Sequence, residues 1–228
     1  MSRKTILLHG AVGSSDQLLF LVQELKNSGY GVFCFEFPGH GKTGIFSDHF
    51  SIEGFADALK MWMNESDLKG AEVFGYSMGG FVALYLAALY PEYFSRITTL
   101  GTKFDWTEEI AEKEVKMLDA EKIAEKVPAF AKELESRHTA IGWRKNLELT
   151  SAMMRSLGKK NVLTEKEFAQ IKIPVCILLG DSDKMVTREE SENAAGKIHG
   201  AEFMLLENTP HPIEKVNIAA LMKVLVGA

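Results

Sequence analysis

The sequence predicts an α/β protein with a mostly parallel sheet of about six strands, helices on both faces, and a helical segment inserted after the fourth strand. Short apolar runs that end at glycine or proline alternate with segments of helical spacing, which is typical of strands joined by crossover helices. This rhythm stops between residues 103 and 172 and then resumes. A length of 228 residues with 46% apolar residues suits one globular domain carrying one insertion.

The chain before residue 103 is expected to contain four strands and three helices. Buried parallel strands read as short continuous apolar runs, whereas helices place apolar residues three and four positions apart. We expect strands at residues 5–9, 31–37, 72–76 and 97–100. The helices between them are expected at about residues 18–25, 51–64 and 81–90, with Ser51 as an N-cap.

The insertion, residues 103–172, is predicted to be helical because it is rich in Glu, Lys, Ala and Met with apolar residues at helical intervals. Pro128 is expected near a helix start. The α/β rhythm then resumes with strands at 173–180 and 202–206 and helices at about 188–198 and 213–225. Sites in open parallel sheets lie beyond the carboxyl ends of the strands, so an insertion there can cover the site. We expect a core of residues 1–102 and 173–228 and a cap of residues 103–172.

The clearest candidate for a catalytic motif is the stretch Val73-Phe74-Gly75-Tyr76-Ser77-Met78-Gly79-Gly80. The pattern Gly-x-Ser-x-Gly stands between an apolar strand and a helix, where an abrupt turn exposes the serine hydroxyl. Glycine is needed on both sides because a side chain would collide with the neighbouring strand or helix. We therefore predict that Ser77 is a nucleophile.

A serine nucleophile needs a base, and His211 is the histidine best placed for that role. It follows the last predicted strand between two prolines that stiffen the loop. His9 and His40 are interpreted as loop-shaping residues. His49 and His138 are expected on the surface, and His199 closes a helix.

The base in turn needs a carboxylate, and the loop after the fifth strand offers two, Asp181 and Asp183. Asp183 lies further out on the loop and is the preferred acid, because Asp181 is also explained as a turn-forming aspartate. Asp105, just beyond the fourth strand, is a minor alternative. With Asp183 the chain order is Ser, Asp, His.

An oxyanion formed during acyl transfer needs two backbone N–H donors. The residue after the nucleophile, Met78, supplies one at the start of a helix. We expect the other from Ala11, in the glycine-rich loop after the first strand.

Composition excludes several other classes. A net charge of −5 without a Lys/Arg cluster argues against nucleic-acid binding. No metal-ligand spacing and no dinucleotide fingerprint are present, so we expect no metal and no cofactor. Cys34 and Cys176 are predicted to be free thiols, and the apolar run near the N-terminus is too short for a signal peptide or a membrane span. We expect a cytoplasmic monomer or homodimer.

These motifs resemble the α/β-hydrolase fold family. The matching pieces are Leu8–Ser14, Glu36–Gly41, Gly75–Gly80, Gly180–Asp183 and Pro210–Pro212, in the family's order. The resemblance implies a serine hydrolase with Ser77, Asp183 and His211 as the triad, Ala11 and Met78 as oxyanion donors, and residues 103–172 as the cap. Glu36 stands where similar sequences often have Asp, and we expect it to affect loop structure more than chemistry.

The predicted activity is hydrolysis of a small to medium carboxylic ester, lactone or thioester through an acyl-enzyme, on a substrate with an apolar acyl or alkyl part. Met117, Met153, Met154 and Trp143 are expected to line the pocket. A carbon–carbon bond hydrolase or lyase with the same triad is the alternative, favoured if Arg137, Arg144 and Arg155 gather in the pocket. A non-catalytic ligand receptor is a third hypothesis.

Overall fold

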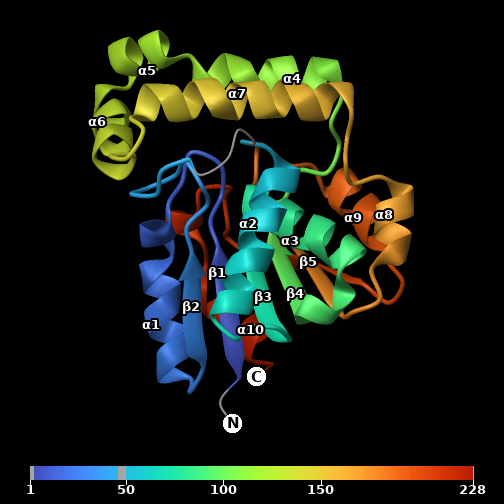
Figure 1. Ribbon diagram of the computed structural model, residues 1–228. Helices are drawn as coiled ribbons and strands as arrows, with labels where there is room; N and C mark the ends of the chain where they lie inside the picture. The colour runs from blue at the N-terminus through green and yellow to red at the C-terminus, as the bar shows by residue number, and fades with distance from the viewer. Residues whose placement is uncertain (1–2, 46–49, 228) are drawn as a thin grey trace.

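The computed structural model describes residues 3–45 and 50–227, which form an α/β core beneath a layer of helices (Figure 1). Within these residues six strands form one sheet in the order β2-β1-β3-β4-β5-β6, and every neighbouring pair is parallel. The predicted sheet is therefore confirmed. The strands are β1 (Lys4–Leu8), β2 (Gly31–Phe35), β3 (Ala71–Tyr76), β4 (Phe94–Leu100), β5 (Val175–Gly180) and β6 (Glu202–Leu206).

Helices cover both faces of the sheet, because successive strand residues point to opposite sides. Leu7 of β1 packs in one apolar cluster, and Ile6 and Leu8 pack in the other. The first cluster is completed by α1 (Leu19–Asn27) and α10 (Ile218–Val226). The second is completed by α2 (Ile52–Glu65), α3 (Met78–Leu89), α8 (Glu165–Gln170) and α9 (Arg188–Lys197).

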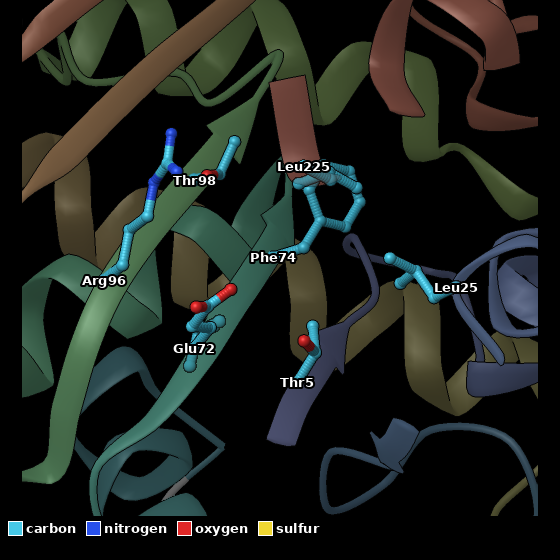
Figure 2. A pocket seen from close by; sticks show the side chains of 8 residues that line it. Thr5, Leu25, Glu72, Phe74, Arg96, Thr98 and Leu225 are labelled. Carbon is cyan, nitrogen blue, oxygen red and sulfur yellow. The ribbon is translucent and has the colours of Figure 1, made fainter. Parts of the chain in front are cut away.

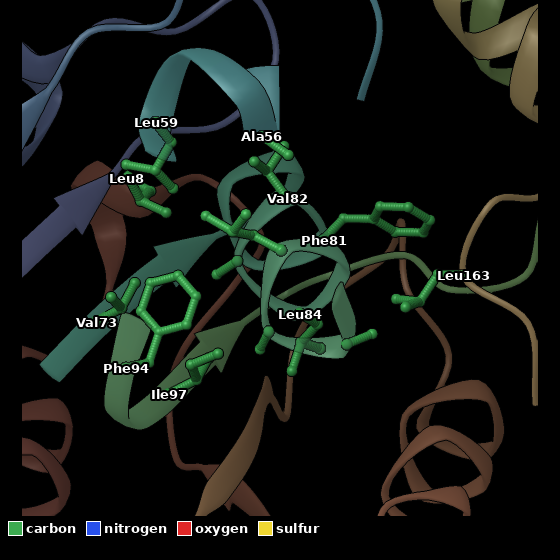
Figure 3. Packing of buried hydrophobic residues seen from close by; sticks show 14 of the residues in the cluster. Leu8, Ala56, Leu59, Val73, Phe81, Val82, Leu84, Phe94, Ile97 and Leu163 are labelled. Carbon is green, nitrogen blue, oxygen red and sulfur yellow. The ribbon is translucent and has the colours of Figure 1, made fainter. Parts of the chain in front are cut away.

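Helix α3 lies at the centre of the second cluster. Figure 3 shows its residues Phe81, Val82 and Leu84 among side chains from the strands and from α2. The helix is apolar around almost its whole circumference, as expected for a helix buried on all sides. Because α3 is buried on every side, the turn at Ser77, which precedes the helix, is held in a fixed position.

The inserted segment is helical, as predicted. In Figure 1 its first four helices lie across the top of the sheet, and α4 packs along α7. Helix α8, which the predicted cap includes, packs instead against α3 and α9 of the core. Pro128 is the first residue of α6, where its missing N–H costs nothing. The four helices are α4 (Glu108–Val115), α5 (Ala120–Lys126), α6 (Pro128–Arg137) and α7 (Trp143–Lys159).

Several element boundaries differ from the sequence prediction: β4 begins at Phe94 and not at residue 97, and α10 begins at Ile218 and not at residue 213. Strand β2 ends at Phe35 and not at Phe37, since the Phe37 N–H donates to the His9 ring. Helix α3 begins at Met78 and not at Phe81, so Gly79 and Gly80 belong to its first turn. Helix propensity disfavours glycine, but close packing against β1 and β4 requires it at these two positions.

Both cysteines are free thiols, as predicted. Burial raises the pKa of Cys34 and of Cys176 to about 11, so neither thiol ionises readily. Within residues 3–45 and 50–227 none of the helices has the length and apolar character needed to cross a membrane.

Candidate active site

Ser77 occupies the turn between β3 and α3. Its backbone has φ 50° and ψ −117°, a strained conformation for a residue with a side chain. The Ser77 N–H donates to the carbonyl oxygen of Leu100 at 2.8 Å. Its carbonyl oxygen accepts from the Gly80 N–H and from the Thr102 hydroxyl, each at 3.0 Å. Bonds to β4 and to α3 therefore hold the strained turn in place.

The glycines around Ser77 are required by close contacts. A Cβ atom at Gly75 would lie 2.5 Å from the Cα of Gly80, and one at Gly79 would lie 2.6 Å from the carbonyl oxygen of Leu8. Real Cβ atoms do not come this close to backbone, so any side chain would force the strand and helix apart. The steric reason predicted for these two glycines is confirmed.

Asp183 and His211 are joined by a hydrogen bond. His211 Nδ1 lies 2.7 Å from Asp183 Oδ2, and the Asp183 side chain is 2% exposed. Asp183 Oδ1 accepts from the N–H groups of Met185 and Val186. Burial raises the pKa of Asp183, but the bond to His211 and these two N–H donors outweigh it and leave the pKa below its usual value. Asp183 is thus held as a carboxylate facing the imidazole.

This pair lies beside the serine turn. A Cβ atom at Gly101, the residue after β4, would be 3.2 Å from Asp183 Oδ2 and 3.3 Å from His211 Nδ1. The His211 ring packs against Tyr76 with ring centroids 5.5 Å apart, and the Tyr76 hydroxyl donates to the His211 carbonyl oxygen. Tyr76, which precedes Ser77, therefore contacts His211, although no hydrogen bond joins the Ser77 hydroxyl to His211 among the described residues.

The two alternative acids have other surroundings. Asp181 is exposed and accepts from the N–H groups of Asn208 and Thr209, which together hold the pKa of its carboxyl below the usual value. It braces the loop that carries His211. Asp105 lies in the segment between β4 and α4, where burial together with the charge of Glu190 raises its pKa. The structure joins Asp183 to His211, and neither alternative makes that contact.

The glycine-rich loop after β1 lies directly against the serine turn. A Cβ atom at Gly10 would be 3.2 Å from the Cβ of Ser77. Ala11 and Met78 line one cavity together with Ser77. Met78 is the first residue of α3, so its N–H has no partner inside the helix. The two expected N–H donors thus border the same cavity as the serine.

His138 is buried, and the prediction that it lies on the surface was wrong. Its Nδ1 accepts the Gly41 N–H at 3.1 Å, so its Nε2 carries the proton and donates to the Val12 carbonyl oxygen at 3.0 Å. Arg137 also donates to the Val12 carbonyl oxygen. The polar sequence around His138 gave no sign of burial, because the contacts come from segments about 100 residues away.

The other histidines mostly follow their predictions. His9 and His40 are fully buried, and their rings pack against each other beneath the Gly10 loop. His9 Nε2 lies 2.8 Å from Glu36 Oε1, and the Glu36 carboxylate accepts from the Ser15 hydroxyl and N–H. Glu36 therefore shapes these loops, as expected. His199 is exposed after α9, and His49 lies outside the described residues.

The cavity at Ser77 has a volume of about 50 Å³ and a mostly apolar wall. Met153 and Met154 of α7 line it as predicted, whereas Met117 is 51% exposed and Trp143 packs within the cap. Sequence analysis missed Lys103 and Trp106 as lining residues, since neither lies in a motif. The full lining is Ala11, Ile52, Ser77, Met78, Phe81, Lys103, Trp106, Met153, Met154 and Leu157.

Two other hollows among the described residues lie away from the serine. The pocket in Figure 2 lies between Thr5, Phe74 and Leu225 and has a volume of only about 10 Å³, room for one water molecule. A wider groove of about 770 Å³ runs between β2 and α2 past Trp62. Neither contains a residue of the Ser77, Asp183 and His211 group. Among the described residues no cluster of three or more His, Cys, Asp or Glu side chains is placed to hold a metal ion.

Comparison with known proteins identifies the family. The model of the alpha/beta hydrolase fold matches residues 6–132, more than half of the chain. The chain belongs to the α/β-hydrolase fold family. It is 34% identical over 90 residues to the pimeloyl-(acyl-carrier protein) methyl ester esterase of Neisseria meningitidis, a match covering 40% of the chain and 33% of that protein.

Two further matches span nearly the whole chain. The (E)-2-((N-methylformamido)methylene)succinate hydrolase of Acinetobacter baylyi is 21% identical, with 94% of this chain and 87% of that protein covered. An esterase from Exiguobacterium antarcticum has a similar structure, with a TM-score of 0.81, 16% identity, and 99% and 91% of the two chains covered. The chain spans only 23% to 33% of the length of two of the curated relatives it matches.

Proposed function

We propose that this protein is a serine hydrolase that cleaves a small to medium carboxylic ester, lactone or thioester. The observation that carries the proposal is the Asp183–His211 hydrogen bond of 2.7 Å beside the strained Ser77 turn. The esterase and hydrolase names of the relatives support an ester hydrolase. In this proposal residues 1–102 and 173–228 form the catalytic core. The insertion, residues 103–172, forms the cap through helices α4 to α7, while its last helix, α8, packs on the core.

The proposed reaction begins when the Ser77 hydroxyl attacks the ester carbonyl and His211 takes its proton. Asp183 orients the imidazole and stabilises its positive charge. The N–H groups of Ala11 and Met78 stabilise the oxyanion of the tetrahedral intermediate. The alcohol leaves with the proton from His211. Water, activated by the same histidine, then hydrolyses the acyl-enzyme and releases the acid.

The alternative of a carbon–carbon bond hydrolase or lyase is less well supported. Arg144 pairs with Glu121, and Arg155 pairs with Glu112, on the outside of the cap. Arg137 pairs with Glu133 and donates to the Val12 carbonyl oxygen. None of the three is among the residues that line the Ser77 cavity. The wall therefore suits a substrate with a small apolar group better than a dicarboxylate.

The first experiment is covalent labelling with a fluorophosphonate probe, which reacts with activated serines, with Ser77→Ala as the control. Hydrolysis of p-nitrophenyl acetate, butanoate, hexanoate and octanoate then measures the size of the pocket. We expect labelling that is lost in Ser77→Ala and a preference for the shorter esters, because the cavity is only about 50 Å³.

Two results would contradict the proposal. Ser77→Ala protein that still hydrolyses the esters at the wild-type rate would remove Ser77 from the reaction. A folded wild type that is neither labelled nor active would show that Ser77 is not activated, and the receptor hypothesis would then be tested by ligand binding.

A further inference from the structure

A largely buried ammonium group lies just beyond the end of β4. It belongs to Lys103, whose side chain is 15% exposed. The backbone on both sides of this residue is bonded to the core. The Thr102 hydroxyl donates to the Ser77 carbonyl oxygen at 3.0 Å. The Phe104 N–H donates to the Glu190 carboxylate at 2.9 Å. The core therefore fixes the point from which the lysine side chain extends.

Two buried carboxylates flank the ammonium group. Lys103 Nζ lies 3.5 Å from Glu114 Oε1 and 3.9 Å from Glu190 Oε2, and both glutamates are 5% exposed. Opposite charges interact strongly at these distances when they are shielded from water, so the carboxylates hold the ammonium group between α4 and α9. Neither distance is that of a strong hydrogen bond. The ammonium group makes its short hydrogen bond to a different acceptor.

That acceptor is the carbonyl oxygen of Met185, which lies 2.8 Å from Lys103 Nζ. The Met185 carbonyl and the Val186 N–H belong to one planar peptide unit, in which the two groups point in opposite directions. The Val186 N–H donates to Asp183 Oδ1 at 3.0 Å. A single peptide unit therefore joins Lys103 on one side to Asp183 on the other.

The carboxylate at the end of this path is the acid proposed to orient the base. Asp183 Oδ1 accepts the Val186 N–H, and Oδ2 lies 2.7 Å from His211 Nδ1. A carboxylate that is bonded through both oxygens is held in one orientation. An ammonium group on the carbonyl also polarises the peptide unit and strengthens its N–H as a donor. The charge of Lys103 thus acts on the Asp183 carboxylate through the peptide unit.

We propose that Lys103 is a positioning residue that holds the Met185–Val186 peptide unit and thereby fixes the Asp183 carboxylate against the imidazole. The inference rests on the proposed function and adds a residue that acts without touching the reacting atoms. Because Lys103 also lines the Ser77 cavity, substrate binding is the competing role. The two roles differ in kinetics, since poor positioning lowers kcat, whereas loss of a substrate contact raises KM.

The test is Lys103→Met, which replaces the ammonium with an apolar group of similar length. With p-nitrophenyl butanoate we expect kcat to fall about 10–100-fold and KM to stay within about twofold, because a displaced carboxylate orients the imidazole poorly. Lys103→Arg keeps the charge and the N–H donors and should recover part of the loss. The matched control is Lys197→Met on α9, whose lysine is exposed and pairs with Glu165. It should keep the wild-type kcat.

A double-mutant cycle shows whether Lys103 acts through Asp183. In Asp183→Ala the peptide unit has no carboxylate to hold, so adding Lys103→Met should lower kcat by less than about twofold more. If the second substitution lowered kcat by the same factor as in wild type, Lys103 would act by another route and the inference would be wrong. A raised KM with unchanged kcat would also overturn it, because Lys103 would then be a substrate-binding residue.

A second variant covers the case in which Lys103→Met does not fold. That substitution leaves two buried carboxylates without their ammonium group, which destabilises a folded protein. Lys103→Met combined with Glu114→Gln removes one charge of each sign. It is compared with Glu114→Gln alone, and the same fall of about 10–100-fold in kcat is expected.

A structural measurement separates this inference from the proposed function. ¹⁵N NMR of His211 shows which ring nitrogen carries the proton, and a carboxylate fixed at Nδ1 keeps the proton there. We expect a smaller Nδ1–H fraction in the Lys103 variant than in wild type. Equal fractions overturn the positioning role, whether or not esters are cleaved. A folded wild type that is inactive and not labelled at Ser77 overturns the proposed function, and the Nδ1–H fractions still decide whether Lys103 positions Asp183.

Discussion

The two sides of the candidate site are held by different parts of the molecule. On one side, Asp183 and His211 lie in loops of the core that are tied to each other, since Asp181 accepts N–H groups from the loop before His211. On the other side, the carbonyl oxygen of Val12 accepts from Arg137 and His138, which are 125 and 126 residues further along the chain.

The two sides of the site therefore differ in what positions them: the sheet on one side and the cap on the other. The acid and base are positioned by neighbouring strand ends, which the sheet brings together whether or not the cap is docked. The loop that holds Ala11 depends on Arg137 and His138 at the end of α6, which donate to the Val12 carbonyl oxygen. The loop after β2 is held by α7, where Asn146 donates to the Gly39 carbonyl oxygen. Changes in the cap can therefore alter turnover without touching the substrate.

The largest effect is expected on the core side, from Asp183→Asn. The amide still accepts the Met185 and Val186 N–H groups, so the loop keeps its shape, but it cannot stabilise the charged imidazole. We expect kcat for p-nitrophenyl butanoate to fall about 10³–10⁴-fold. Activity within tenfold of wild type would remove Asp183 from the proposed triad.

The next effect tests the cap side through His138→Ala. This change removes the donor to Val12 and the acceptor for Gly41, which loosens the loop next to Ser77. We expect kcat to fall about 10–100-fold, less than the loss of a whole oxyanion donor, with KM nearly unchanged. His138→Gln, whose amide can both donate and accept, should recover part of the loss.

The control for this comparison is His199→Ala, because His199 is exposed and lies after α9. It should have wild-type kcat. If His138→Ala also kept wild-type kcat, the position of the Gly10–Gly13 loop would not depend on the cap.

The pH dependence of the free energy of unfolding also distinguishes the two sides, beginning with His138 on the cap side. Burial and the positive charge of Arg137 lower the pKa of His138 in the folded protein. As the pH falls below about 6.5, the unfolded chain takes up the proton first, so the free energy of unfolding decreases. Urea unfolding at pH 7.5 and pH 5.5 should show a smaller loss in His138→Gln than in wild type. An equal loss would mean that His138 contributes nothing to it.

On the core side, Asp183 affects the free energy of unfolding at a lower pH than His138 does. The pKa of Asp183 is lowered in the folded protein, so its contribution to stability is present above about pH 4 and is lost as the pH falls through the lowered value. Asp183→Asn should therefore match the wild-type pH dependence between pH 7.5 and 5.5 and flatten it only below about pH 4. A difference already present at pH 6 would contradict this assignment.

The smallest effect is expected from Asp181→Ala. Its carboxylate is exposed and only braces the His211 loop through Asn208 and Thr209. We expect a melting temperature lower by a few degrees and kcat within about threefold of wild type. A loss as large as that of Asp183→Asn would instead make Asp181 part of the proton-transfer machinery.

Much of this architecture could be predicted from local sequence. The apolar runs ending at glycine located the strands, and the glycines around Ser77 indicated a tight strand-to-helix turn that the structure contains. The order of Ser77, Asp183 and His211 followed from placing each at a strand end. Ser51 caps α2 by accepting the Gly54 N–H, as its position suggested. These features depend on residues close together in the chain or on one rule of sheet topology.

The misses share one physical cause. His138 looked like a surface residue because its neighbours are polar, yet it is buried between two loops of the core. Met117 looked like a pocket residue because it is apolar, yet it is exposed. Trp106 and Lys103 belong to no motif and reach the cavity only through the path of the chain after β4. Burial of a side chain in a loop or cap is set by contacts with distant segments.

The sequence by itself therefore determined the sheet, the helical insertion and the strained strand-to-helix turn at Ser77, because strand periodicity and turn chemistry act over a few residues. Only the tertiary structure decided which carboxylate bonds to His211, which residues outside the motifs line the Ser77 cavity, and which cap residues hold the Gly10–Gly13 loop. These are properties of distances between segments up to 126 residues apart, and they exist only once the core and the cap helices have packed.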